Sequence, residues 1–191
     1  MIENDGIKNL EEINSKSSFD ILNYELSRRF HDYVAANGIN MTFAEVCDKL
    51  SSPDVISLFV AQRDSPVTYE QFYQSMHVHR AHLRTIFHDY FERNSLDVIF
   101  YPTTPLLPVK VDDFKGPDFT IEHNGKTYVQ VLKSIQNCDI GSNTNSPCIT
   151  MPDRHYMSGS FPVNMEVCTV SGEDKKLIAV ARRVEKVLLG Q

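Results

Sequence analysis

The chain has 191 residues, of which 19 are Lys or Arg and 25 are Asp or Glu, giving a formal net charge of −6. This mild acidity argues against binding to nucleic-acid backbones or anionic membranes, because both attract basic surfaces. With 41% hydrophobic and 23% charged residues, the composition is typical of a soluble globular domain. No apolar stretch is long enough to span a bilayer, and the N-terminal residues lack the basic and apolar regions of a signal peptide. We therefore expect a cytoplasmic protein that binds neither nucleic acid nor membrane.

A helical period opens the chain over residues 17–36, where apolar side chains recur at steps of three and four. Ser17 or Ser18 is expected to cap this helix, and Gly38 is expected to follow its end. The apolar face would consist of Phe19, Leu22, Leu26, Phe30 and Tyr33.

Helix-start signals then recur three times. The spacings Thr42-x-x-Glu45 and Thr68-x-x-Gln71 are capping boxes, and the second opens the longest predicted helix, which runs to about Arg93. Between them, Ser52-Pro53 places an N-cap before a proline at the first helical position. The first half of the chain is therefore predicted to be mainly helical.

Strand character begins at residues 96–102, a compact apolar run that ends at Pro102 and suits a buried strand. Asn124-Gly125 lies at the centre of a predicted hairpin over 119–130. Residues 128–136 fit either the end of this hairpin or a helix. Two further strands are expected over 148–152 and 161–170, joined by a polar loop, and Ser171 is expected to cap a final helix.

This order predicts an α/β fold, in which a helical N-terminal half is followed by the strands of a mixed sheet and a terminal helix. We expect one region over 1–191, with residues 1–95 mainly helical and residues 96–191 made of strands plus helices. The four cysteines, at positions 47, 138, 148 and 168, form no CxxC pair. Free thiols in a reducing compartment are therefore expected.

The sequence offers weak candidates for chemistry. His77, His79, His82 and His88 lie on the longest predicted helix, but at most two of them share a face and no carboxylate has HExxH spacing, so no metal site is predicted. Ser158-Gly159-Ser160 lies between two strands and lacks the setting of a nucleophile elbow. Cys148 could be a nucleophile only if a histidine elsewhere in the fold activated it.

Two polar stretches are better placed to line a pocket. Thr103 and Thr104 follow a strand, where ligands bind in open α/β sheets. The stretch "GSNTNSPCITMP", residues 141–152, reads as a loop that leads into a strand.

Three stretches together resemble the C-terminal part of the amidase-signature enzymes, and most closely their indoleacetamide and mandelamide hydrolase branch. They are "LDVIFYPTTPLLP", "NCDIGSNTNSPCITMP" and "GSFPVNMEVCTVSGEDKKLIAVARRVEKVL". The helical stretches "SSFDILNYELSRRFHDYV" and "VHRAHLRTIFHDYF" fit the same family. The resemblance covers nearly the whole chain and implies that its fold is an incomplete portion of the amidase-signature fold.

The resemblance also implies what this chain would lack. The family hydrolyses amides with a serine nucleophile, a second serine in a cis peptide and a lysine, within a Gly/Ser-rich segment of its N-terminal half. No Gly-Gly-Ser-Ser-Gly run occurs here, so no catalytic residue is assigned to this chain, and no cofactor or metal is implied. The expected partners are a complementary N-terminal amidase half or further copies of the chain, with a small amide as substrate once the site is complete.

Substrate-binding residues are expected on two segments. Thr103, Thr104 and Pro105 would line the crevice beyond the first strand, and Ser142, Asn143 and Asn145 would shape the opposing loop; simple turn formation is the alternative for all six. Two other functions stay open. The chain could be a non-catalytic binding or interaction module derived from an amidase scaffold, or an independent hydrolase that uses Cys148 or Ser160 with His155.

Overall fold

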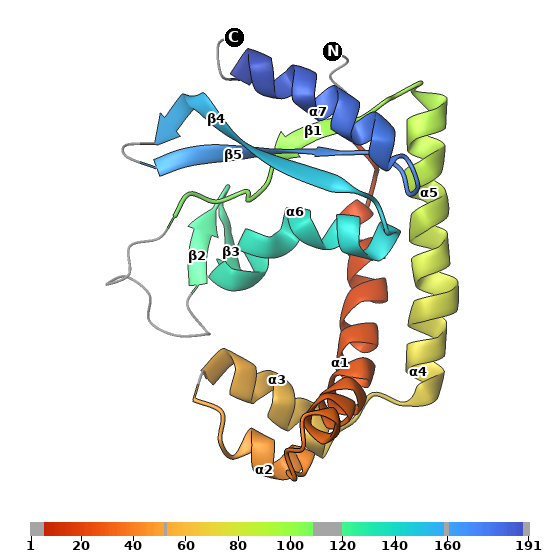
Figure 1. Ribbon diagram of the computed structural model, residues 1–191, viewed down its shortest axis with the longest axis vertical. Coiled ribbons are helices and arrows are strands. Elements are labelled where there is room, and N and C mark those ends of the chain that lie inside the picture. The colour runs from red at the N-terminus through yellow and green to blue at the C-terminus, as the bar shows by residue number, and fades with distance from the viewer. Residues whose placement is uncertain (1–5, 52, 109–119, 159–160, 189–191) are drawn as a thin grey trace.

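The computed structural model describes residues 6–51, 53–108, 120–158 and 161–188. Figure 1 shows a sheet with helix α7 on one face and helix α6 on the other. The long helices α1 and α5 run from this end of the molecule towards the short helices α2 and α3 at the other end. None of the helices in the described ranges is long and apolar enough to cross a membrane.

Helix α1 (Leu10–Ala36) begins earlier than its sequence predicts. The chain enters it through Asn9 in the left-handed region (φ 57°), and Ser17 is a buried residue within the helix whose hydroxyl donates to the Asn14 carbonyl. Ser17 and Ser18 are therefore not caps. A serine that bonds the backbone three residues earlier is compatible with helix, which is why the cap prediction was wrong.

The buried side of α1 also differs from the predicted face. Ile21 and Val34 are buried, whereas Phe19, Leu22 and Tyr33 are 45%, 49% and 63% exposed. Leu26 and Phe30 pack against the small cluster formed by Val46, Cys47 and Phe59. Within the described residues, three of the five side chains of the predicted apolar stripe are thus exposed.

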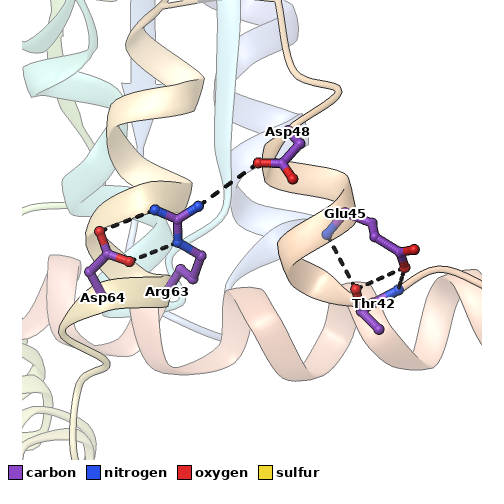
Figure 2. A network of polar contacts seen from close by, with 5 residues as sticks. All are labelled: Thr42, Glu45, Asp48, Arg63 and Asp64. Carbon is purple, nitrogen blue, oxygen red and sulfur yellow. Dashed lines mark hydrogen bonds and ion pairs between the residues drawn. The ribbon is translucent and has the colours of Figure 1, made fainter.

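Both capping boxes are confirmed. In the first, the Glu45 backbone N–H donates to Thr42 Oγ1 (3.2 Å) and the Thr42 backbone N–H donates to Glu45 Oε2 (2.8 Å), which starts α2 (Phe43–Cys47; Figure 2). The hydrogen bonds that the Thr42 backbone N–H and hydroxyl donate to the Glu45 carboxylate lower its pKa. Next to it, Arg63 of α3 (Pro53–Asp64) pairs with Asp64 at 2.7 Å and reaches Asp48 at 4.0 Å (Figure 2). Exposed pairs of this kind contribute little stability. Ser52 lies outside the described residues.

The longest predicted helix is confirmed but is not uniform. It starts at the Thr68–Gln71 box as α4 (Tyr69–Tyr73), widens into the π-helical segment η1 (Gln74–His79) and continues as α5 (Arg80–Arg93). Ser75, within the widened turn, is buried and donates to the Lys16 carbonyl (3.1 Å) and to Asp20 (3.0 Å) of α1. The π segment therefore lies where this helix packs on α1, a tertiary contact that local spacing does not encode.

The sheet contains β1 (Ile99–Pro102), β5 (Phe161–Cys168) and β4 (Cys148–Ser158) in that order, all antiparallel. Its register places Cys168 of β5 between Ile99 and Cys148. The strand predicted at 96–102 is present but is an edge strand, with Phe100 exposed, rather than a fully buried one.

Each face of the sheet has its own core. Met151 and Val167 pack on Leu177 and Ala181 of α7 (Asp174–Leu188). On the other face, Cys168 packs with Phe87 and Phe91 of α5. Helix α7 begins at Asp174, so Ser171 is not its cap; the Ser171 hydroxyl instead accepts a hydrogen bond from Asn145.

The hairpin of β2 (Thr120–His123) and β3 (Lys126–Val129) is confirmed, and Asn124 and Gly125 both have positive φ, at 52° and 72°. Positive φ at both central residues is the requirement of a type I′ turn, which Asn-Gly meets at little cost. This hairpin leads directly into α6, so residues 130–136 are helical.

Helix α6 (Gln130–Thr144) corrects the predicted loop over 141–152. Gly141, Ser142, Asn143 and Thr144 form its last turn, and Asn145 ends it in the left-handed region (φ 59°). Strand β4 starts only three residues later. Polar, turn-forming residues can close a helix as well as build a loop, and the position of the αL residue decides between them. With these corrections, the predicted class holds, namely a helical first half followed by strands and a closing helix.

Candidate functional site

A pocket of about 640 Å³ lies where the end of α6, the start of β4, the centre of β5 and the turn before α7 meet. We call it the α6–β4 pocket. Its lining includes Cys138, Gly141, Ser142, Asn145, Cys148, Glu166 and Asp174.

Two predicted site residues line this pocket. Ser142 and Asn145 are both exposed at its edge, on the last turn and the cap of α6. The Asn145 side-chain amide donates to the Ser171 hydroxyl at 3.0 Å. Since Asn145 holds the turn before α7 in this way, one side of the pocket is fixed by a side chain that also ends the helix.

Asn143 lies on a different side of α6 from Asn145. It is 3% exposed, its Nδ2 donates to Asn14 Oδ1 at 2.9 Å, and its Oδ1 accepts from Arg80 Nη2 at 2.8 Å. Asn14 in turn donates to Asp139 at 2.7 Å. Asn143 thus joins α1, α5 and α6 through a buried polar network and does not line the α6–β4 pocket.

Of the three predicted residues after β1, Thr103 lies beside the pocket. The Thr103 hydroxyl is 3.4 Å from the Thr150 hydroxyl, and the Thr103 carbonyl accepts from the Cys138 thiol at 3.5 Å. Thr104 bonds the Leu106 carbonyl at 3.2 Å, and Pro105 is half-buried. Thr103 therefore adjoins the pocket through Cys138 and Thr150, whereas Thr104 makes a local turn contact.

Glu166, which the sequence did not single out, is 5% exposed and reaches the pocket from β5. Its carboxylate accepts a hydrogen bond from the Tyr101 hydroxyl at 2.7 Å and from the Thr150 hydroxyl at 3.5 Å. Burial, the nearby Cys168 and the bond to Glu166 raise the pKa of Tyr101, so Tyr101 remains the donor. A single charged residue inside this strand was the available signal, because buried charges need partners.

The thiols around the pocket are poor nucleophiles. Cys148 donates its S–H to Cys168 Sγ at 2.9 Å. That bond, together with burial, raises the pKa of the Cys148 thiol, and burial raises the pKa of Cys138. Because the thiolate is the reactive form, neither Cys138 nor Cys148 is activated for attack at neutral pH. Neither the side chain of His155 nor any part of Ser160 is among the residues and side chains that the structure describes.

The pocket is nevertheless equipped to hold a polar group. The lining residues supply hydroxyls, a side-chain amide and the carboxylates of Glu166 and Asp174, and among the described ones none is Lys, Arg or His. Such a set suits a neutral hydrogen-bond donor such as a carboxamide.

Away from the pocket, the ligand atoms of His88, Asp89 and Glu92 lie within 4.8 Å of one another on the exposed side of α5. Exposed acidic groups commonly gather in this way without a metal.

Gly141 lines this pocket next to Cys148, and its substitution tests how tightly the two are packed. A Cβ added at Gly141 would lie 2.8 Å from Cys148 Sγ. We expect Gly141→Ala to lower the free energy of unfolding by about 1–2 kcal/mol, because overpacking exceeds the gain in helix propensity. Urea unfolding measures this loss. In a Cys148→Ala background the clashing sulfur is gone, and adding Gly141→Ala is expected to cause no further loss. An equal loss in both backgrounds would contradict this account.

Comparison with known proteins places these features in a context. No family model matches the chain. The chain is 29% identical over 190 residues to an indoleacetamide hydrolase of Rhizobium radiobacter, covering 96% of this chain and 38% of that protein. It is 30% identical over 186 residues to an indoleacetamide hydrolase of Agrobacterium vitis, covering 95% and 38% respectively. A mandelamide hydrolase of Pseudomonas putida is 27% identical over 187 residues, covering 93% and 35%.

The fold has a counterpart among solved structures. The crystal structure of an amidase superposes with a TM-score of 0.65 at 17% identity, covering 90% of this chain and 34% of that one. The sequence resemblance to the amidases is therefore confirmed, as is the fold. The chain spans about 38% of the length of the first indoleacetamide hydrolases that it matches.

Proposed function

The chain is related over nearly all of its length to the indoleacetamide and mandelamide hydrolases, and we propose that it forms one wall of the substrate pocket of an amide hydrolase. The α6–β4 pocket supports this role, because Ser142, Asn145 and Glu166 bring hydrogen-bonding groups together without an activated nucleophile. Amide hydrolysis needs a nucleophile, a base and an oxyanion hole that act as a unit. In this proposal those groups come from a complementary amidase segment.

An apolar groove supplies a docking face for that segment. It lies along α1, has a volume of about 590 Å³, and its apolar lining consists of Ile21, Leu22, Leu26, Phe30 and Tyr33. Leu22 and Tyr33 are largely exposed in the described structure. The relatives are more than twice as long as this chain, so the remainder of an amidase domain is the occupant that we propose for the groove. The outer edges of β1 and β4 would pair with its further strands.

Complementation tests this function. The chain would be mixed with the part of the Pseudomonas putida mandelamide hydrolase that precedes the matching region, and ammonia release from mandelamide and indoleacetamide would be measured. We expect no release by the chain alone, and a rise on the order of 10³-fold or more on mixing, because a concerted catalytic set is lost or gained as a unit. In the mixed enzyme, Ser142→Ala and Asn145→Ala are expected to raise KM.

Matched surface variants separate docking from folding. Leu22→Asp places a charge in the groove, whereas Val187→Asp places one on α7, and both parent side chains are exposed. We expect both variants to fold, and only Leu22→Asp to abolish complementation. Turnover by the chain alone would instead support an independent hydrolase. Amide binding that never leads to turnover in the mixture would support a non-catalytic binding module.

A further inference from the structure

Cys148 and Cys168 face each other across adjacent antiparallel strands. The register of β4 and β5 places the two residues directly opposite one another, and their Sγ atoms are 2.9 Å apart. Directly opposed residues of such a pair have Cα atoms about 4.5–5.5 Å apart, a separation that lies within the range that disulfides require. Forming a bond between these sulfurs therefore needs no movement of either strand.

Access to the pair comes from one side. Cys148 is exposed and lines the α6–β4 pocket, whereas Cys168 is buried beneath it. Gly141 leaves room for the Cys148 sulfur, because any larger residue there would meet it. A small molecule in the pocket thus reaches Cys148 first, and Cys168 is the sulfur held behind it.

We propose that Cys148 and Cys168 are an oxidation site that closes to an intrachain disulfide when the chain meets a peroxide. In the first step Cys148 loses its proton, its thiolate attacks one peroxide oxygen, the O–O bond breaks, and the departing hydroxide takes up that proton, so that a sulfenic acid and one water form. In the second step Cys168 loses its proton, its thiolate attacks the Cys148 sulfur, the S–O bond breaks, and the departing hydroxide takes up that proton and leaves as a second water. Two thiols and one hydrogen peroxide thus give one disulfide and two waters.

The electrostatics of the pair favour the second step and slow the first at neutral pH. Because Cys168 accepts the S–H of Cys148, the pKa of Cys168 is lowered, which favours the thiolate that the second step needs. The same bond raises the pKa of Cys148, so the first step is faster as the pH rises. We therefore expect the rate of oxidation to increase from pH 7 to pH 9.

A metal bound by both thiols is the competing use of the pair. Two thiolates that bind a tetrahedral Zn²⁺ at about 2.3 Å are about 3.8 Å apart. The separation of 2.9 Å between the two sulfurs is shorter than this, so one cysteine side chain would have to turn away from the other to bind zinc. Geometry therefore favours the disulfide.

Peptide mapping tests the proposal on the full chain. The folded protein is treated with hydrogen peroxide, free thiols are alkylated under denaturing conditions, and the chain is digested with trypsin. Cleavage after Lys133, Arg154 and Lys175 puts Cys138 and Cys148 on one peptide and Cys168 on the next. We expect these two peptides to be linked, with the loss of two hydrogen atoms in mass, and the link to be broken by a reductant.

Variants identify the sulfurs. Cys138→Ala is expected to keep the link, and both Cys148→Ala and Cys148→Ser are expected to abolish it; the serine variant keeps a hydroxyl donor in case the alanine variant folds poorly. A link that survives in the Cys148 variants would overturn the proposal, as would the absence of any link in the folded Cys138→Ala chain. Stoichiometric Zn²⁺ binding by the reduced chain that needs both Cys148 and Cys168 would also overturn it, in favour of a metal site.

Discussion

Phe87→Ala is expected to lower the free energy of unfolding by about 3–5 kcal/mol, the usual cost of removing a buried phenylalanine. Phe87 is 2% exposed and lies between α5 and the sheet, with its ring centroid 5.2 Å from that of Phe91. Cys168 of β5 belongs to the same cluster. The substitution therefore leaves a cavity exactly between the helical half and the strands, and the surrounding backbone elements cannot close it without shifting.

The measurement is thermal or urea unfolding, with a fall in melting temperature of about 2–4 °C per kcal/mol for a chain of this size. Phe19→Ala is the matched control, because it deletes the same side chain from a largely exposed position on α1. That variant is expected to change the free energy of unfolding of the free chain by less than about 0.5 kcal/mol. Equal losses in the two variants would show that Phe87 does not join the two halves.

Asn143→Ala is expected to lower the free energy of unfolding by about 3 kcal/mol, because it leaves buried polar groups without partners. The change removes the acceptor of Arg80 Nη2 and the donor to Asn14 Oδ1. Arg80 is already poorly solvated. Its Nε has no hydrogen-bond partner in the described structure, and burial lowers the pKa of its guanidinium. A further lost bond to this cation is therefore costly.

Ser142→Ala is the control for Asn143, since it changes the neighbouring exposed residue on the same turn of α6. Its expected effect on the free energy of unfolding lies within about 0.5 kcal/mol. The two substitutions are therefore expected to have different effects. Ser142→Ala changes KM in the complemented enzyme, and Asn143→Ala changes the free energy of unfolding. If Asn143→Ala were as stable as the unsubstituted chain, the polar network would not hold α1, α5 and α6 together.

Local signals in the sequence predicted the parts of the fold that depend on neighbouring residues. The boxes at Thr42 and Thr68 and the Asn124-Gly125 turn are formed by residues at most three positions apart, so their chemistry is visible in a short window. The start of α1 was missed for the opposite reason. Asn14 and Ser18 bond Asp139, which lies more than a hundred positions away, and no helical period reveals that a polar side of α1 is the buried one.

The candidate site likewise contains some residues that local sequence signals could place and others that depend on the tertiary fold. Ser142 and Asn145 could be placed near a pocket because they precede a strand, and the structure puts both at its edge. Asn143 is a polar residue of the same stretch. Its side chain nevertheless faces α1 and α5, because α6 turns by about 100° per residue up to its last turn. The sequence predicts a loop over 141–144, and a loop does not imply that rotation. Glu166 and Cys168 could be recognised only through the strand register.

The pairing of Tyr101 with Glu166 has a consequence for how the sheet assembles. Strand β1 has only four residues and a partner on one side among the described strands, so its ladder hydrogen bonds to β5 alone fix its alignment weakly. A slip by one residue would bring Phe100 or Pro102 opposite Glu166 and would turn the side chains of β1 to the other face. The carboxylate would then be buried without its phenol donor, which is strongly unfavourable. The buried Glu166 carboxylate thus favours the alignment of β1 that places Tyr101 opposite it over alignments shifted by one residue.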